Sequence, residues 1–167
     1  MIELFKHGAF VPSYHPTKQP YIKKAATMIT QNSRKYSFWD ISGLYHSQDL
    51  QNLHNSLHEI HQKNIDIINI YVFNIAEYEE HKHELAMHAQ NCKERGYIAL
   101  AIATRGDKLN STERRNLNAE MSRIYGMPTK VFDLTLAPVG EILNFIESGA
   151  TNAARCKKHE SHKLNHD

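Results

Sequence analysis

The chain has 167 residues, of which 41% are hydrophobic and 23% are charged, with 20 Lys and Arg against 18 Asp and Glu. This length predicts one domain with a substantial core, and a net charge of +2 argues against nucleic acid and against an anionic membrane surface as partners. No apolar run reaches the ~20 residues that span a bilayer, and the N-terminus lacks the apolar stretch of a signal peptide. Cys92 and Cys156 are too few for a disulfide framework. We therefore expect a cytoplasmic protein without an integral membrane segment.

The first elements that the pattern predicts are two strands. Residues 21–30 mix β-branched and small side chains, and residues 35–41 (K-Y-S-F-W-D-I) are rich in aromatic side chains. The residues between them, Q-N-S-R at 31–34, favour a turn, so this segment predicts an antiparallel hairpin. Because aromatic side chains in a strand usually belong to a core, we expect Phe38 and Trp39 to be buried. The alternative is an exposed patch that contacts a partner.

After the hairpin the pattern alternates between helix and strand. Periodicity and capping residues predict a helix around 50–60, a strand over 66–74, a helix over 76–95 that ends at Gly96, a strand over 97–104, a helix from the capping pair Asn110 and Glu113 to Tyr125, a weaker strand over 129–136, and a helix from Pro138 to Ile146. This alternation predicts an α/β fold of three layers, with a mostly parallel sheet and helices on both faces. Residues 150–167 are polar, basic and rich in His, which predicts a flexible tail.

In such a sheet, ligands bind at the loops that follow the carboxyl ends of the strands. One of these loops reads W-D-I-S-G at residues 39–43, and another reads T-R-G-D-K-L at residues 104–109. An acidic residue at a strand end followed by Gly suits a metal-bound phosphate, because the carboxylate holds Mg²⁺ and Gly lets the backbone approach an oxygen. The carboxylate in the second loop can also accept hydrogen bonds from a guanine edge.

Several segments, in order, resemble small GTPases of the Ras/Rab superfamily. F-V-P-S-Y-H-P-T at 10–17 is similar to the first switch loop, W-D-I-S-G at 39–43 to the second, I-Y-V-F-N at 70–74 to the central strand that follows, and T-R-G-D-K-L at 104–109 to the guanine-specificity loop. The resemblance runs from Ile2 to Ile146. It implies a Ras-like G domain over residues 1–149 that lacks the family's N-terminal strand and phosphate-binding loop.

Carried over residue by residue, the resemblance implies a nucleotide site made of Phe10, Thr17, Asp40, Gly43, Thr104, Arg105 and Asp107. GTP or GDP would be the ligand, with Mg²⁺ held by Thr17 and, through water, by Asp40. Phe10 would flank the base, the Gly43 backbone would contact the γ-phosphate, and Asp107 would read guanine. Thr104 and Arg105 stand where the family usually has Asn and Lys, and the planar fork of Arg differs from an ammonium group.

Three departures from the family predict impaired nucleotide binding and hydrolysis. The sequence contains no G-x-x-x-x-G-K-[ST], the loop that wraps the phosphates. Losing about five charge-assisted hydrogen bonds at ~1.5 kcal/mol each removes at least ~7 kcal/mol, or roughly five decades of affinity. Leu44 occupies the position of the water-orienting Gln, and the family's final loop is not recognisable at 132–136. We therefore assign no catalytic residue.

The sequence thus favours a degenerate small-GTPase-like module, regulatory or protein-binding, whose partner contacts the loops from Phe10 to Thr17 and from Asp40 to Tyr45. One alternative is a GTP-binding hydrolase whose phosphate site is completed in another way. A weaker alternative is a metal-binding protein that uses His54, His58 and His61, which fall on one side of the helix predicted around 50–60. The family's N-terminal central strand is absent from this sequence, and four explanations of how the sheet is completed stay open. The flanking strands close up, another segment fills the position, a second chain pairs there to form an oligomer, or the true start of the chain lies upstream.

Overall fold

The computed structural model describes residues 22–29, 35–41, 55 and 66–163. The chain divides into two compact units, Met1–Ile65 and Asp66–Asp167. The helix predicted around 50–60, with its three histidines, lies outside the described residues apart from position 55. The prediction of one domain over 1–149 therefore stays a prediction.

The described part of the first unit is a β-hairpin. Strands β1 (Ile22–Ile29) and β2 (Lys35–Ile41) pair antiparallel, as predicted, with Ile22 opposite Ile41 and a shift of register between Lys24 and Ala26. Phe38 is buried as expected, whereas Trp39 is 57% exposed, so the expectation that both belong to a core is wrong for Trp39. Successive side chains of a strand point to opposite faces, and only one face of β2 is covered here.

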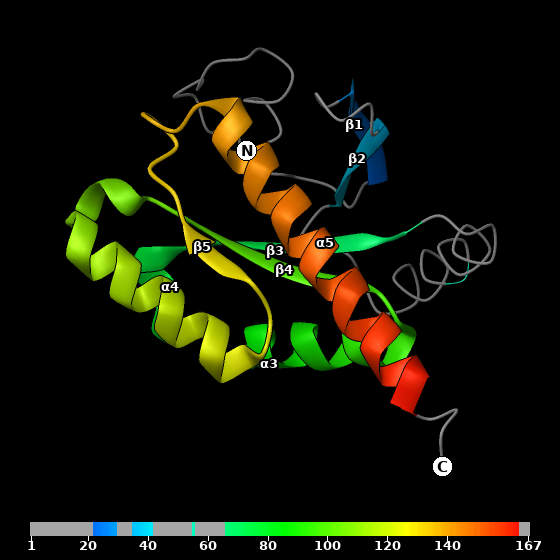
Figure 1. The fold of residues 1–167 in the computed structure, drawn as a ribbon. Coiled ribbons are helices and arrows are strands. Elements are labelled where there is room, and N and C mark those ends of the chain that lie inside the picture. The colour runs from blue at the N-terminus through cyan, green and yellow to red at the C-terminus, as the bar shows by residue number, and fades with distance from the viewer. Residues whose placement is uncertain (1–21, 30–34, 42–54, 56–65, 164–167) are drawn as a thin grey trace. The chain divides into compact units, whose positions relative to one another are not determined.

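The second unit is built around a parallel sheet with strand order β3-β4-β5, formed by β3 (Ile68–Asn74), β4 (Ile98–Thr104) and β5 (Thr129–Val131). The helices α3 (Tyr78–Arg95), α4 (Ser111–Tyr125) and α5 (Val139–Lys163) follow the strands in turn (Figure 1). Short 3-10 turns, η1 (Ile75–Glu77) and η2 (Gly106–Lys108), connect strands to helices. The predicted α/β fold with a parallel sheet is confirmed. Within the described residues, none of the helices has the length and apolar character needed to cross a membrane.

The helix ends predicted from capping residues are confirmed. The Asn110 side chain accepts hydrogen bonds from the backbone N–H groups of Thr112 and Glu113, and the Glu113 carboxylate accepts one from the Asn110 N–H, which completes a capping box. Helix α3 ends at Gly96 and α4 at Gly126, with φ of 71° and 62°. These left-handed conformations are those in which Gly is favoured over other residues.

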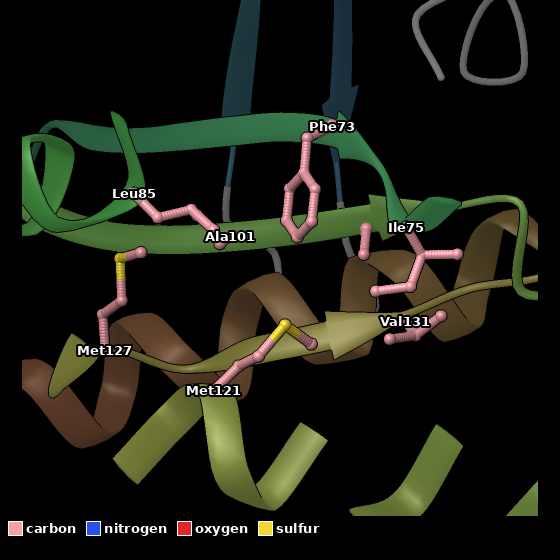
Figure 2. Close-up of a cluster of buried hydrophobic side chains, with 8 residues drawn as sticks. Phe73, Ile75, Leu85, Ala101, Met121, Met127 and Val131 are labelled. Atoms are coloured by element: carbon pink, nitrogen blue, oxygen red, sulfur yellow. The ribbon is translucent and has the colours of Figure 1, made fainter. Parts of the chain in front are cut away.

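Two hydrophobic layers lie on opposite faces of the parallel sheet. On one face, Phe73 of β3 and Ala101 of β4 belong to a buried cluster with Leu85 of α3 and Met121 of α4 (Figure 2). On the other face, Leu100 and its neighbour Ile102 are fully buried. A Cβ at Gly149 of α5 would lie only 2.5 Å from Leu100 Cδ2, so α5 packs closely on that second face. The described second unit therefore has helices on both faces of its sheet.

Helix α3 contacts the sheet through polar as well as apolar side chains. The Tyr71 hydroxyl lies 3.0 Å from His81 Nδ1, and His88 Nε2 lies 3.2 Å from the Leu100 carbonyl oxygen. Burial lowers the pKa of His88, although hydrogen bonds to backbone carbonyls oppose that shift. One turn further along α3, Cys92 is 1% exposed, and its burial raises its pKa to about 11. These groups fix how α3 lies on the sheet.

The last strand is shorter than predicted. Residues 129–136 were expected to form it, but β5 ends at Val131. The Phe132 N–H still donates to the Ala103 carbonyl (2.8 Å), and the chain then turns, because the Asp133 carbonyl accepts from the N–H groups of Leu136 (3.1 Å) and Ala137 (2.8 Å). A strand cannot continue through these local hydrogen bonds.

The last helix is longer than predicted. It was expected to end at Ile146, but α5 runs to Lys163 and therefore includes most of the segment 150–167 that was interpreted as a flexible tail. Ala150, at the start of that segment, is buried. The close approach of Gly149 to Leu100 shows that β4 covers α5 beyond Ile146, whereas the sequence shows only that large apolar residues become rare.

Candidate functional site

Two loops meet at the carboxyl edge of the parallel sheet. The first follows β4 and contains η2, and the second follows β5. The Gly106 N–H donates to the Phe132 carbonyl at 3.0 Å and so joins the two loops. A Cβ at Gly106 would lie 2.9 Å from both the carbonyl carbon and the carbonyl oxygen of Phe132, so only Gly permits this approach. The sequence segment T-R-G-D-K-L thus forms a fixed shelf at the edge where parallel sheets bind ligands.

Thr104 is the last residue of β4 and is half-buried. Its hydroxyl donates to the Phe73 carbonyl at 3.0 Å, which ties the end of β4 to the end of β3. The hydroxyl proton is used within the sheet, and the Thr104 oxygen keeps only acceptor capacity toward a ligand.

Arg105 has an unusual backbone. Its φ of 63° and ψ of 32° place it in the left-handed region, and it is the only residue other than Gly with positive φ among the residues that the structure describes. For a residue with a Cβ this conformation costs roughly 1–2 kcal/mol. The cost is met by the hydrogen bonds that hold the neighbouring turn, including those from Lys108 N–H to the Arg105 carbonyl (3.3 Å) and from Leu109 N–H to the Gly106 carbonyl (3.1 Å).

The Asp107 carboxylate lies at the exposed side of this shelf, with its side chain 32% exposed. Arg105 Nε approaches its Oδ1 at 3.3 Å, and Lys108 Nζ approaches its Oδ2 at 3.8 Å. Both cations are more than half exposed, so each pair contributes only ~0.2–1 kcal/mol. A ligand could replace these contacts at small cost, but it would meet a carboxylate whose charge is already compensated.

Asp133 is a second carboxylate at this edge, and the sequence reasoning did not single it out. Its Oδ1 accepts hydrogen bonds from the Thr135 N–H at 3.0 Å and from the Thr135 hydroxyl. These hydrogen bonds lower the pKa of Asp133. The signal available in the sequence was D-L-T, an acidic residue two positions before Thr, which is typical of a side-chain-capped turn. Asp133 Oδ1 therefore holds the turn after β5 through Thr135.

The structure brings together only part of the predicted nucleotide site. Thr104, Arg105 and Asp107 lie on the shelf described above. Asp40 lies in β2, opposite Lys23 of β1, and so belongs to the first unit. Phe10, Thr17 and Gly43 lie outside the described residues. In the part of the chain that the structure describes, no group of three or more His, Cys, Asp or Glu is placed to hold a metal ion.

Known proteins add no identification. No family model matches the chain, and no curated protein shows a significant match to it. The likeness to Ras/Rab small GTPases therefore depends on the sequence segments quoted above, with an α/β architecture that is compatible with it in its coarse features.

Proposed function

We propose that this chain is a degenerate small-GTPase-like module that acts by binding a protein partner and has lost tight binding of nucleotide. The observation that carries the small-GTPase-like part of the proposal is the shelf at the carboxyl edge, where Asp107 stands at the position that the resemblance assigns to guanine recognition. Its carboxylate contacts Arg105 and Lys108 of the same loop. The loop that would recognise the base is thus retained, while the carboxylate oxygens of Asp107 contact cations of the same loop.

The magnitudes indicate which loss matters more. Displacing two exposed ion pairs costs a ligand at most ~2 kcal/mol, because each pair is worth ~0.2–1 kcal/mol. Losing the phosphate-binding loop, which the sequence does not contain, removes at least ~7 kcal/mol. The base side of the site is therefore weakened only slightly, and nucleotide binding fails on the phosphate side. A GTP-binding hydrolase would need phosphate ligands from elsewhere.

An exposed aromatic side chain supports the protein-binding part of the proposal. Trp39 is 57% exposed on β2, directly before Asp40, where the second switch-like loop begins. Exposed Trp residues are enriched among the residues that dominate protein–protein binding energy. The proposed partner surface consists of the loops at residues 10–17 and 40–45 together with Trp39, and of those loops the structure describes only Asp40 and Ile41.

The test is the melting temperature of the full chain with Mg²⁺ alone and then with GDP, GTP or ATP. A ligand at 100 times its Kd stabilises a protein by about 2.7 kcal/mol, which raises Tm by roughly 5–10 °C at ~2–4 °C per kcal/mol. We expect no shift with any of the nucleotides. The proposal is wrong if GDP and GTP, but not ATP, raise Tm and Asp107→Ala removes that shift. Glu79→Ala is the matched control, because Glu79 also forms a surface ion pair, with Lys82 at 2.7 Å, but lies on α3.

A further inference from the structure

Strand β5 is attached to the sheet by a short ladder. It pairs with β4 over three residue pairs, whereas β3 pairs with β4 over seven. The Phe132 N–H donates to the Ala103 carbonyl at 2.8 Å, so the even-numbered residues of this segment direct their backbone groups toward β4. The N–H groups of Thr129 and Val131 consequently point away from β4.

Two side chains of α4 accept hydrogen bonds from these outward N–H groups. The Val131 N–H donates to Asn118 Oδ1 at 2.7 Å, and the Thr129 N–H donates to Ser122 Oγ at 3.0 Å. The Ser122 hydroxyl in turn donates to the Thr129 carbonyl at 3.3 Å. A neighbouring strand would otherwise make such bonds, so α4 takes the place of a strand beside β5, within the same unit of the chain.

The dimensions of helix and strand explain why two side chains are enough. Asn118 and Ser122 are four positions apart, a rise of about 6 Å along an α-helix. Thr129 and Val131 are two positions apart, a rise of about 6.6 Å along a strand. Two successive outward N–H groups of β5 therefore meet two side chains that lie one helical turn apart. Met121, between the two helix positions, belongs to the same buried cluster as Val131 (Figure 2).

We propose that Asn118 and Ser122, which we call the α4 clamp, are positioning residues of the candidate site. The clamp holds β5, and the residue that directly follows Val131 is Phe132, whose carbonyl accepts the Gly106 N–H and joins the two loops of the shelf. The first loop leads directly into α4, so this helix holds the first loop through the chain and the second through the clamp. The inference does not depend on the proposed function, because it concerns how the loops are held and not what they bind.

Amide hydrogen exchange of the native full chain, resolved by NMR, tests this inference. In the wild type the amides of Thr129 and Val131 should be protected, although they point away from β4. Asn118→Leu should accelerate exchange at Val131 and at Gly106 by roughly tenfold, which corresponds to the loss of one hydrogen bond. Leu is a better helix former than Asn, so a weakened α4 would not explain such a change.

Control variants and reference amides separate positioning from general stability. Asn116→Leu makes the same change at an exposed position of α4 and should leave exchange at the wild-type rates. Asn118→Asp keeps an oxygen acceptor for the Val131 N–H and should retain most of the protection. The amides of Leu100 and Ile102 face β3, so Asn118→Leu should not accelerate their exchange.

Four results would overturn the inference. Fast exchange at Thr129 and Val131 in the wild type would show that the clamp does not form. Wild-type exchange at Gly106 in Asn118→Leu would show that the shelf is held without α4. Equal acceleration at Gly106 and Leu100 would show a general loss of stability instead. Exchange in Asn118→Asp as fast as in Asn118→Leu would show that the oxygen acceptor is not what holds β5.

Discussion

Replacing Gly106 with Ala tests whether the two loops of the candidate site are joined as described. The added Cβ would lie 2.9 Å from the carbonyl carbon and oxygen of Phe132 and 3.0 Å from the Asp133 nitrogen. These are backbone atoms, which cannot move aside as the end of a side chain can. Overpacking of this kind costs ~1–3 kcal/mol, and loss of the hydrogen bond between the Gly106 N–H and the Phe132 carbonyl costs a further ~0.5–1.5 kcal/mol. We expect Gly106→Ala to lower the free energy of unfolding by about 1.5–4.5 kcal/mol.

The assay is urea and thermal unfolding followed by circular dichroism, with Gly140→Ala as the matched control. Gly140 lies in the first turn of α5, where an added Cβ would meet nothing within 4 Å, so the same change there should be neutral or stabilise the chain by up to ~1 kcal/mol. At ~2–4 °C per kcal/mol, Gly106→Ala should lower Tm by at least about 3 °C. If both variants are as stable as wild type, the loops after β4 and β5 are not in contact and the description of the shelf is wrong.

Three further outcomes can be measured. Burial lowers the pKa of His88, so the unfolded chain binds the proton more readily than the folded chain does. The free energy of unfolding should therefore fall as pH drops below ~6.5, the usual His pKa. A smaller pH dependence of unfolding in His88→Gln would support this, and an unchanged one would contradict it. The chain has one Trp, so intrinsic fluorescence of the native protein should be quenched readily by acrylamide, because Trp39 is 57% exposed; strong protection from the quencher would show that β2 is covered. Asn110→Ala should cost ~0.5–2 kcal/mol in chemical unfolding by removing the α4 cap, and Asn110→Ser should retain most of that stability.

The features that could be predicted from the sequence are those set by neighbouring residues. The Asn110 cap and the end of α3 at Gly96 depend on side chains and backbone within a few positions, and both are present. Strands β3 and β4 were recognisable because each is a short, continuous apolar run, which is typical of a strand covered on both faces. The structure shows such burial for β4, whereas in β3 only Phe73 is buried and Val72 is exposed.

The features that were missed depend on contacts between distant parts of the chain. The sequence could not show that β5 ends at Val131, because the turn after it is fixed by Asp133 and by the approach of Gly106 from another loop. Helix α5 continues past its predicted end at Ile146, and β4 still covers one of its faces there, as the contact of Gly149 with Leu100 shows. That contact cannot be predicted from the number of large apolar residues in the helix.

The position of the loop at 104–109 could be predicted from the sequence, but its geometry only in part. The loop at 104–109 could be located because ligand sites of parallel sheets lie at the carboxyl ends of the strands. The left-handed backbone of Arg105, whose side chain pairs with Asp107, could not be predicted, because sequence patterns assign this conformation to Gly or Asn.

The buried thiol of α3 has a practical consequence for following the motions of this protein. Burial raises the pKa of Cys92 to about 11, so its thiol is protonated at pH 7, and the folded chain also shields it from reagents. A reagent reaches it only when α3 separates from the sheet. The rate at which Cys92 is alkylated, resolved from that of Cys156 by peptide mapping, therefore measures how often this helix opens while the rest of the domain stays folded.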